Sequence, residues 1–271
     1  YLNALIARAR RVIYRRPPSR FRWAGLWDLI ARDYPRRLRA EAPLLLLSAL
    51  LTFGPAALGY LAMALDPAWV RSLFPHLFTM LEQAGYQRQA VPGALATAIP
   101  EEQFASASAF IAANNINVSI LVYGLGLTFG LGTLYHLAQN GTMLGVVAFY
   151  YLTRGPEFQE YFYAGILPHG VWELTAIVVA GASGLMLARA LLFPGDLART
   201  EALRREAPKT LPLMGGVVLM LLVAGAIEGF ITPHKTMDPY LKMAIGLGSG
   251  VLFWIYVFVA GRERRLRPAA H

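Results

Sequence analysis

The sequence contains no cysteine, which excludes disulfide scaffolds, thiolate metal sites and cysteine nucleophiles. Charge is also scarce, because Asp, Glu, Lys and Arg make up 15% of the 271 residues, against about 25% in an ordinary soluble domain. The glycines and prolines follow no period, which excludes a collagen-like or low-complexity chain. Apolar residues instead make up 56% of the chain. This composition excludes disorder and is typical of a protein whose solvent is largely lipid.

The positive charge is concentrated at one end of the chain. Residues 1–39 contain eleven Arg and two Asp, so this segment alone accounts for the net charge of +9. Aromatic residues are interleaved with the arginines, which indicates an interfacial helix on lipid head groups. We therefore predict a basic, helical, cytosolic or interfacial segment over residues 1–41, with membrane lipids as partners. The arginines expected to contact lipid head groups are Arg8, Arg10, Arg11, Arg15, Arg16, Arg36, Arg37 and Arg39.

Two further expectations concern this end of the chain. No nucleic-acid-binding module can be recognised in the basic segment, so nucleic acid is not expected as a partner. The chain begins at Tyr1 without a methionine, and its first residues do not follow the pattern of a secretory signal peptide. We therefore expect the sequence to start inside a longer native chain.

Long apolar runs predict an all-α fold, a polytopic transmembrane helix bundle with about six spans in residues 42–271. The run 142–153 is short, and its length leaves a span or a re-entrant hairpin open. A re-entrant hairpin would place the arginine-rich tail outside, so the positive-inside rule favours a span and cytosolic termini in a prokaryotic inner membrane. Loop 66–117 is then extracytosolic, and a turn is expected at 138–141. The predicted spans are about 43–65, 118–137, 142–160, 166–193, 211–231 and 241–260.

Small residues recur at the spacing that lets helices approach closely. The pattern Gly-x-x-x-Gly begins at Gly126, Gly141 and Gly246. Helix packing inside one bundle is the favoured interpretation, and a homo-oligomer stays open as the alternative.

Ionisable residues within the predicted spans point to a polar site, because they are costly at membrane depth. His169 and Glu173 are four residues apart and share one helix face. A hydrogen-bond network that joins two helices is favoured over a proton or metal site, since one pair is two ligands short of a zinc site. No metal and no cofactor is therefore expected. The candidate polar cluster, all on the outer side, comprises His169, Glu173, Asn114, Asn115, Asn117, Glu101 and Glu102.

Three other polar residues in the spans receive structural interpretations. Arg189 is expected to reach the inner interface with its long side chain, and Glu228 to lie at head-group level near the outer end of its span. Gly181-Ala-Ser183-Gly184 resembles the nucleophile motif of rhomboid intramembrane proteases, and His136-x-x-x-Asn140 resembles another rhomboid element. Neither later span supplies a histidine as the base that a serine nucleophile needs, so no catalytic residue is predicted.

The segment Ile166-Leu-Pro-His-Gly-Val-Trp-Glu173 resembles the signature of the stage II sporulation protein M (SpoIIM) family of integral membrane proteins. Asn114-Asn-Ile-Asn-Val118 is similar to the polar entry to that family's second span, and Asp33-Tyr-Pro-Arg-Arg-Leu-Arg39 to the element before its first span. The resemblance implies a membrane component that anchors partner proteins, as the sporulation member is thought to anchor peptidoglycan-degrading partners. The role of most relatives is largely unknown, and no catalytic residue is carried over.

These observations lead to one expected function and two alternatives. The expected function is a non-enzymatic scaffold or complex subunit that anchors other membrane or envelope proteins. The first alternative is a transporter or channel whose polar site surrounds His169 and Glu173. The second is a rhomboid-like serine protease that uses Ser183.

Overall fold

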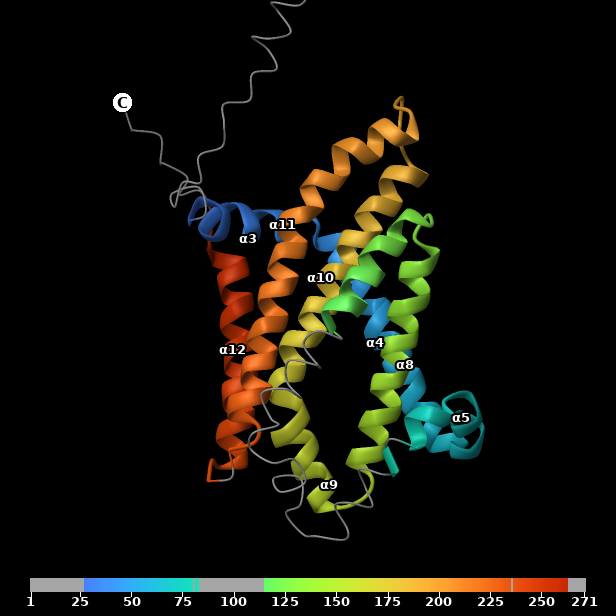
Figure 1. Ribbon diagram of the computed structural model, residues 1–271, viewed down its shortest axis with the longest axis vertical. Helices are drawn as coiled ribbons and strands as arrows, with labels where there is room; N and C mark the ends of the chain where they lie inside the picture. The colour runs from blue at the N-terminus through green and yellow to red at the C-terminus, as the bar shows by residue number, and fades with distance from the viewer. Residues whose placement is uncertain (1–26, 80, 83–114, 235, 263–271) are drawn as a thin grey trace, which may run out of the picture.

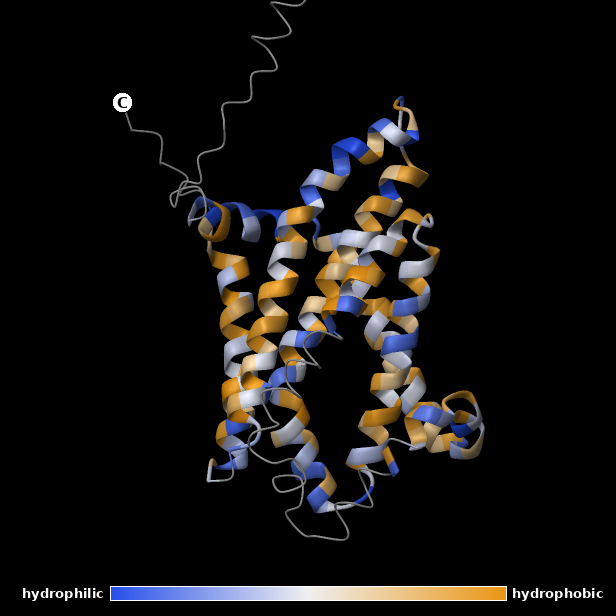
Figure 2. Cartoon of the chain, viewed as in Figure 1, coloured by the Kyte–Doolittle hydropathy of each residue, from blue (hydrophilic) through white to orange (hydrophobic). Residues whose placement is uncertain are grey.

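The computed structural model describes residues 27–79, 81–82, 115–234 and 236–262, and every regular element in these ranges is a helix (Figure 1). The all-α fold class is thus confirmed. Within these ranges, four helices are long and apolar enough to cross a membrane, by length and composition, and Figure 2 shows the hydrophobic residues along them. The chain is therefore described as a membrane protein, while the expected count of about six spans is not confirmed. The four helical segments are Ala42–Leu65, Pro156–Leu192, Arg199–Ile231 and Pro239–Val259.

The bundle is built around one central helix, α10 (Leu167–Leu192), of which the residues from 176 to 188 are all buried. Helix α11 (Arg199–Ala226) packs along it, and α12 (Pro239–Val259) and α4 (Ala42–Leu65) contact it as well. Helix α8 (Leu131–Leu152) packs along α4. A helix buried on all sides by other helices is expected to be apolar all round, and this explains the small apolar residues that fill α10.

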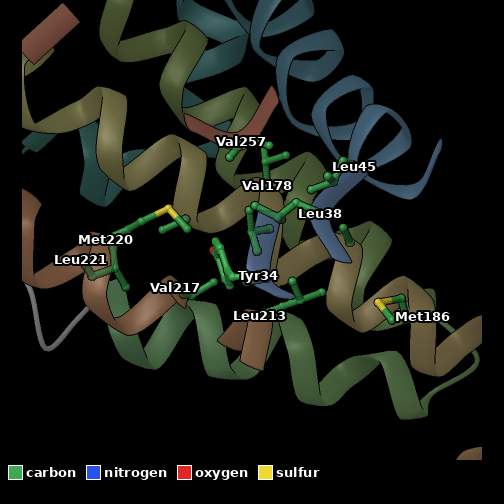
Figure 3. Packing of buried hydrophobic residues seen from close by; sticks show 14 residues of the cluster. Tyr34, Leu38, Leu45, Val178, Met186, Leu213, Val217, Met220, Leu221 and Val257 are labelled. Atoms are coloured by element: carbon green, nitrogen blue, oxygen red, sulfur yellow. The ribbon is translucent and has the colours of Figure 1, made fainter. Parts of the chain in front are cut away.

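A hydrophobic cluster ties the short helix α3 (Tyr34–Ala40) to the long helices. Figure 3 shows Tyr34 and Leu38 among apolar side chains of α10, α11 and α12. Arg36 Nε donates a 2.7 Å hydrogen bond to Gly261 O, and Arg39 donates to the carbonyls of Val257 and, at 2.8 Å, Ala260. The described beginning and end of the chain therefore lie at the same end of the bundle.

The chain reverses at a different place from the predicted one. The predicted span 118–137 is wrong, because the Asn115–Leu127 helix ends before a turn in which Phe129 has a φ of 55° and Gly130 a φ of 84°. Glycine adopts this left-handed conformation without steric cost. The turn sends α8 back alongside the helix that precedes it, and Thr133 Oγ1 donates to Val122 O at 2.7 Å.

The expected turn at 138–141 and the expected span 142–160 are also wrong, because α8 runs through these positions without interruption from Leu131 to Leu152. Two of its polar side chains donate to backbone carbonyls one turn earlier in the same helix: Asn140 to His136 O at 2.8 Å and Thr142 to Ala138 O at 2.9 Å. Such bonds let polar residues remain in a helix interior. Beyond the end of α8, the chain forms α9 (Pro156–Tyr161) and the π-helix η4 (Phe162–Ile166).

The remaining boundaries agree with the sequence more closely. Helices α4, α10 and α12 begin and end within two residues of the predicted spans 43–65, 166–193 and 241–260. Helix α11 begins at Arg199 rather than near 211 and is extended by the π-helix η5 (Ile227–Ile231). Within the predicted loop 66–117, residues 67–73 form α5 (Pro67–Leu73) and 75–79 are helical.

Glycines allow the helix backbones to touch at several crossings. A Cβ atom at Gly141 would lie 2.0 Å from Thr52 O, and one at Gly145 would lie 1.9 Å from Ala56 O, both across the α4–α8 contact. A Cβ atom at Gly126 would meet Gly184 O at 2.1 Å. Each of these glycines packs against the same chain, as the sequence analysis favoured.

Candidate functional site

Three ionisable side chains meet where α10 begins and α11 ends, at the end of the bundle opposite α3. His169 and Glu173 lie on the first turns of α10, and Glu228 lies on η5. One potential ligand atom from each of the three lies within 4.8 Å of the others. We call these three residues the His-Glu-Glu cluster.

The local sequence explains why these side chains share one site. Pro168 occupies the first turn of α10, where its missing N–H costs no hydrogen bond. His169 and Glu173 then lie one above the other, because residues four apart share a helix face. Helix α12 approaches closely on this side, since a Cβ atom at Gly246 would lie 2.3 Å from Pro168 Cα.

The predicted polar cluster is brought together only in part. Asn115 joins it, because its side-chain amide donates a 2.5 Å hydrogen bond to Glu173 Oε1. Asn117 is exposed, as expected for a residue two positions along the same helix and so on another face. Asn114, Glu101 and Glu102 lie outside the described residues.

Sequence reasoning did not connect Glu228 with His169 and Glu173. In the structure Glu228 completes the His-Glu-Glu cluster, and its Oε2 atom is buried. Its level relative to lipid head groups stays a prediction. The signal available in the sequence was a carboxylate in the same outer half of the membrane as His169 and Glu173. No sequence spacing relates it to the pair, because Glu228 lies on a different helix.

Two carboxylates and an imidazole at this spacing form an unusual environment. Within the described part of the chain, none of the three residues forms a salt bridge. Lys242, on the first turn of α12, donates instead to the backbone carbonyl of Thr232 at 2.7 Å. Two like charges in an apolar surrounding favour uptake of protons or binding of a cation. This arrangement offers one nitrogen and several oxygen donors for such a cation.

The α3 end of the bundle contains a second set of charges, and these are paired. The Arg189 guanidinium donates to both carboxylate oxygens of Glu41, at 2.8 and 3.0 Å, and to Glu206 Oε1 at 2.7 Å. Lys209 donates to Glu206 Oε2 at 2.7 Å. Arg189 therefore joins α10 to α4 and α11 through ion pairs, where the sequence predicted a side chain reaching to the interface.

The Ser183 hydroxyl has a structural partner within its own helix. Its side chain is fully buried, and Oγ donates to Val179 O in the same helix at 2.8 Å. A serine nucleophile needs a base within hydrogen-bond reach and a path for its substrate. Among the described residues, no histidine is hydrogen-bonded to Ser183.

The arginines expected at lipid head groups divide into two sets. Arg36 and Arg39 donate to backbone carbonyls at the end of α12, and Arg37 is half-buried in α3. Contact of these residues with lipid stays a prediction. Arg8, Arg10, Arg11, Arg15 and Arg16 lie outside the described residues.

Comparison with known proteins identifies the family. The model of the family described as stage II sporulation protein M matches residues 47–233. An uncharacterized protein of Methanocaldococcus jannaschii is 30% identical over 141 residues, which are 51% of this chain and 77% of that protein. No solved structure matches. Since the matched region contains both the signature segment and Glu228, and covers most of the helices, this chain belongs to the stage II sporulation protein M family.

Proposed function

We propose that this protein is a non-enzymatic scaffold, a subunit that holds partner proteins at the prokaryotic inner membrane with both of its termini in the cytosol. The observation that carries the proposal is the close packing of helix backbones within one chain. Helices α4 and α8 touch through Gly141 and Gly145, and α10 and α12 touch through Pro168 and Gly246. Contacts of this kind favour a bundle that keeps one shape, which suits a platform for other proteins.

The orientation follows from charge. The α3 end of the bundle contains Arg36, Arg37 and Arg39 and the ion pairs of Arg189. The positive-inside rule places this end in the cytosol. The opposite end, with α5 and the His-Glu-Glu cluster, then faces outward.

Each end of the bundle offers a surface for partners. At the outer end, α5 projects to the side of the bundle, and its Trp69 and Leu73 side chains are 56% and 53% exposed (Figure 1). Exposed apolar side chains beside a membrane-spanning bundle suit contact with another membrane protein. At the inner end, α3 presents basic side chains to acidic partners or lipid.

Site-specific photo-crosslinking in native membranes tests the scaffold. A photoreactive residue at Leu73 on α5 or at Ala40 on α3 is expected to give discrete protein adducts. The matched control is Leu252, a 66% exposed side chain on the apolar face of α12, which is expected to react with lipid alone. The α3 adduct should also weaken when Arg37 is changed to Glu.

Two outcomes would contradict the scaffold. The same adducts at all three positions, or lipid adducts alone, would show that neither end holds a specific partner.

The transporter is the second candidate, because the His-Glu-Glu cluster places ionisable groups within the spanning helices. Ion flux through the purified protein in liposomes, removed by Glu173→Gln, would favour the transporter instead.

A further inference from the structure

We propose that His169, Glu173 and Glu228 bind a divalent transition-metal ion, of which Zn²⁺ is the first to test. The inference does not depend on the scaffold, because it concerns three side chains and not the partners of the protein. It goes beyond the sequence prediction, which found two ligands and therefore expected no metal. The third ligand comes from η5, which only the folded chain brings to α10.

The donor set suits such an ion. Imidazole nitrogen binds zinc and other transition metals, and carboxylate oxygen binds zinc, manganese and iron. Three protein ligands leave a fourth position for water, as in zinc sites with an open position. Metal–ligand distances of about 2 Å place donor atoms roughly 3–3.5 Å apart. The donor atoms now lie within 4.8 Å of one another, so small rotations of the carboxylates would bring them to the ion.

Charge balance favours a divalent ion at this place. The two ionised carboxylates carry two negative charges and the neutral imidazole carries none, so one divalent cation would neutralise the cluster. An ionised carboxylate in an apolar surrounding without a partner is strongly unfavourable. A bound ion would therefore let both carboxylates remain ionised between packed helices.

Unpaired buried atoms provide a second, independent observation. In the described part of the chain, six buried side-chain polar atoms have no hydrogen-bond partner. Three of these belong to His169, Glu228 and Thr232, the last of which follows Glu228 by one helical turn. Buried polar atoms are normally paired, and the binding of an ion is one reason for an exception. Two of the six unpaired atoms thus belong to proposed ligands of the ion.

The residues and helix turns around the His-Glu-Glu cluster resemble those that orient ligands in known metal sites. Asn115 holds Glu173 Oε1 through a 2.5 Å hydrogen bond, and partners that orient a ligand in this way raise the affinity for metal. Both helices also contain a π-helical turn at this end, η4 immediately before α10 and η5 at the end of α11. Such turns occur frequently at functional sites because they redirect side chains.

The test is metal binding by the purified protein in detergent or lipid nanodiscs. After chelator treatment and removal of the chelator, the wild type is expected to take up about one zinc ion per chain. Glu228→Gln and Glu173→Gln keep the shape of the side chains and should lower the affinity at least about tenfold. Glu201→Gln, on the same helix as Glu228 but paired with Arg205 at its exposed other end, is the control and should bind as the wild type does.

Cobalt provides a readout that is separate from affinity. Co²⁺ in a site of three protein ligands should give visible absorption bands of an ordered, low-coordinate ion, and Glu228→Gln should remove them. Zinc should also raise the Tm of the wild type but not that of Glu228→Gln. Size-exclusion chromatography first checks that the wild type and Glu228→Gln are both folded. No zinc uptake by the folded wild type would overturn the proposal. Equal uptake by the wild type and Glu228→Gln would also overturn it, since the ion would then be held elsewhere.

Discussion

Single residues at the α3 end of the bundle show how the protein pairs its charges. Arg189 follows a run of buried residues in α10 and contacts carboxylates from two other segments, Glu41 and Glu206. The Glu206 side chain is only 12% exposed, so loss of its partner would leave a largely buried charge with Lys209 alone. The cost of such a loss exceeds the value of the ion pair itself.

The change Arg189→Gln is therefore expected to destabilise the protein by about 1–2 kcal/mol, a range reduced because the Arg189 side chain is itself 43% exposed. Arg205→Gln is the matched control, since Arg205 forms an exposed pair with Glu201 one turn away. The control should change stability by no more than about 0.5 kcal/mol. Thermal unfolding in detergent compares the two, and equal effects would contradict the role assigned to Arg189.

Among the helices, the contact between α4 and α8 depends most clearly on residue size. Helix α8 has the length of a span, but its polar residues make it less apolar than the four candidate spans. Its backbone nevertheless lies directly on α4, because Gly141 and Gly145 present no side chain there. Close approach of this kind is the main source of attraction between helices that share an apolar solvent.

The change Gly145→Ala is expected to destabilise the protein by about 1–3 kcal/mol, because the new Cβ atom would lie 1.9 Å from Ala56 O and force the helices apart. Gly248→Ala on α12 is the control, since a Cβ atom there meets nothing within 4 Å. The control should be neutral or should gain up to about 1 kcal/mol from helix propensity. Denaturant titration in mixed micelles measures both, and a neutral Gly145→Ala would show that α4 and α8 are separable.

The whole molecule has two ends of different character. The α3 end contains arginines and the ion pairs of Arg189, and the described beginning and end of the chain meet there through Arg36 and Gly261. The other end contains α5 and α9 (Figure 1) as well as the His-Glu-Glu cluster. In the orientation that we propose from the positive-inside rule, the basic end faces the cytosol and the other end faces outward.

Cysteine labelling tests this orientation cleanly, because the chain has no native cysteine. Single cysteines at Asp196 and Arg262, both exposed at the α3 end, should react with a membrane-impermeant maleimide only after the cells are opened. Cysteines at Thr153 and Thr236, both exposed at the other end, should react in intact spheroplasts. Labelling of one member of either pair from the opposite side would contradict the arrangement of the bundle.

Several properties follow from the amino-acid sequence alone. The scarcity of charge and the long apolar runs determine an all-helical membrane protein, because a backbone in lipid must satisfy its hydrogen bonds within its own segment. The same runs determine the extents of α4, α10 and α12 closely. The spacing of His169 and Glu173 determines that they share one helix face.

Other properties are decided only in the tertiary structure. The reversal at Phe129–Gly130 interrupts an apolar run that reads as one span, because hydropathy does not depend on the left-handed conformation of a single glycine. Helix α8 continues through the polar positions 136–142, where Asn140 and Thr142 bond to carbonyls of their own helix. Glu228 lies 55 residues after Glu173 in the sequence, yet it joins Glu173 and His169 in one cluster. The packing of α11 on α10 sets the distance between these residues, and no local spacing in the sequence encodes it.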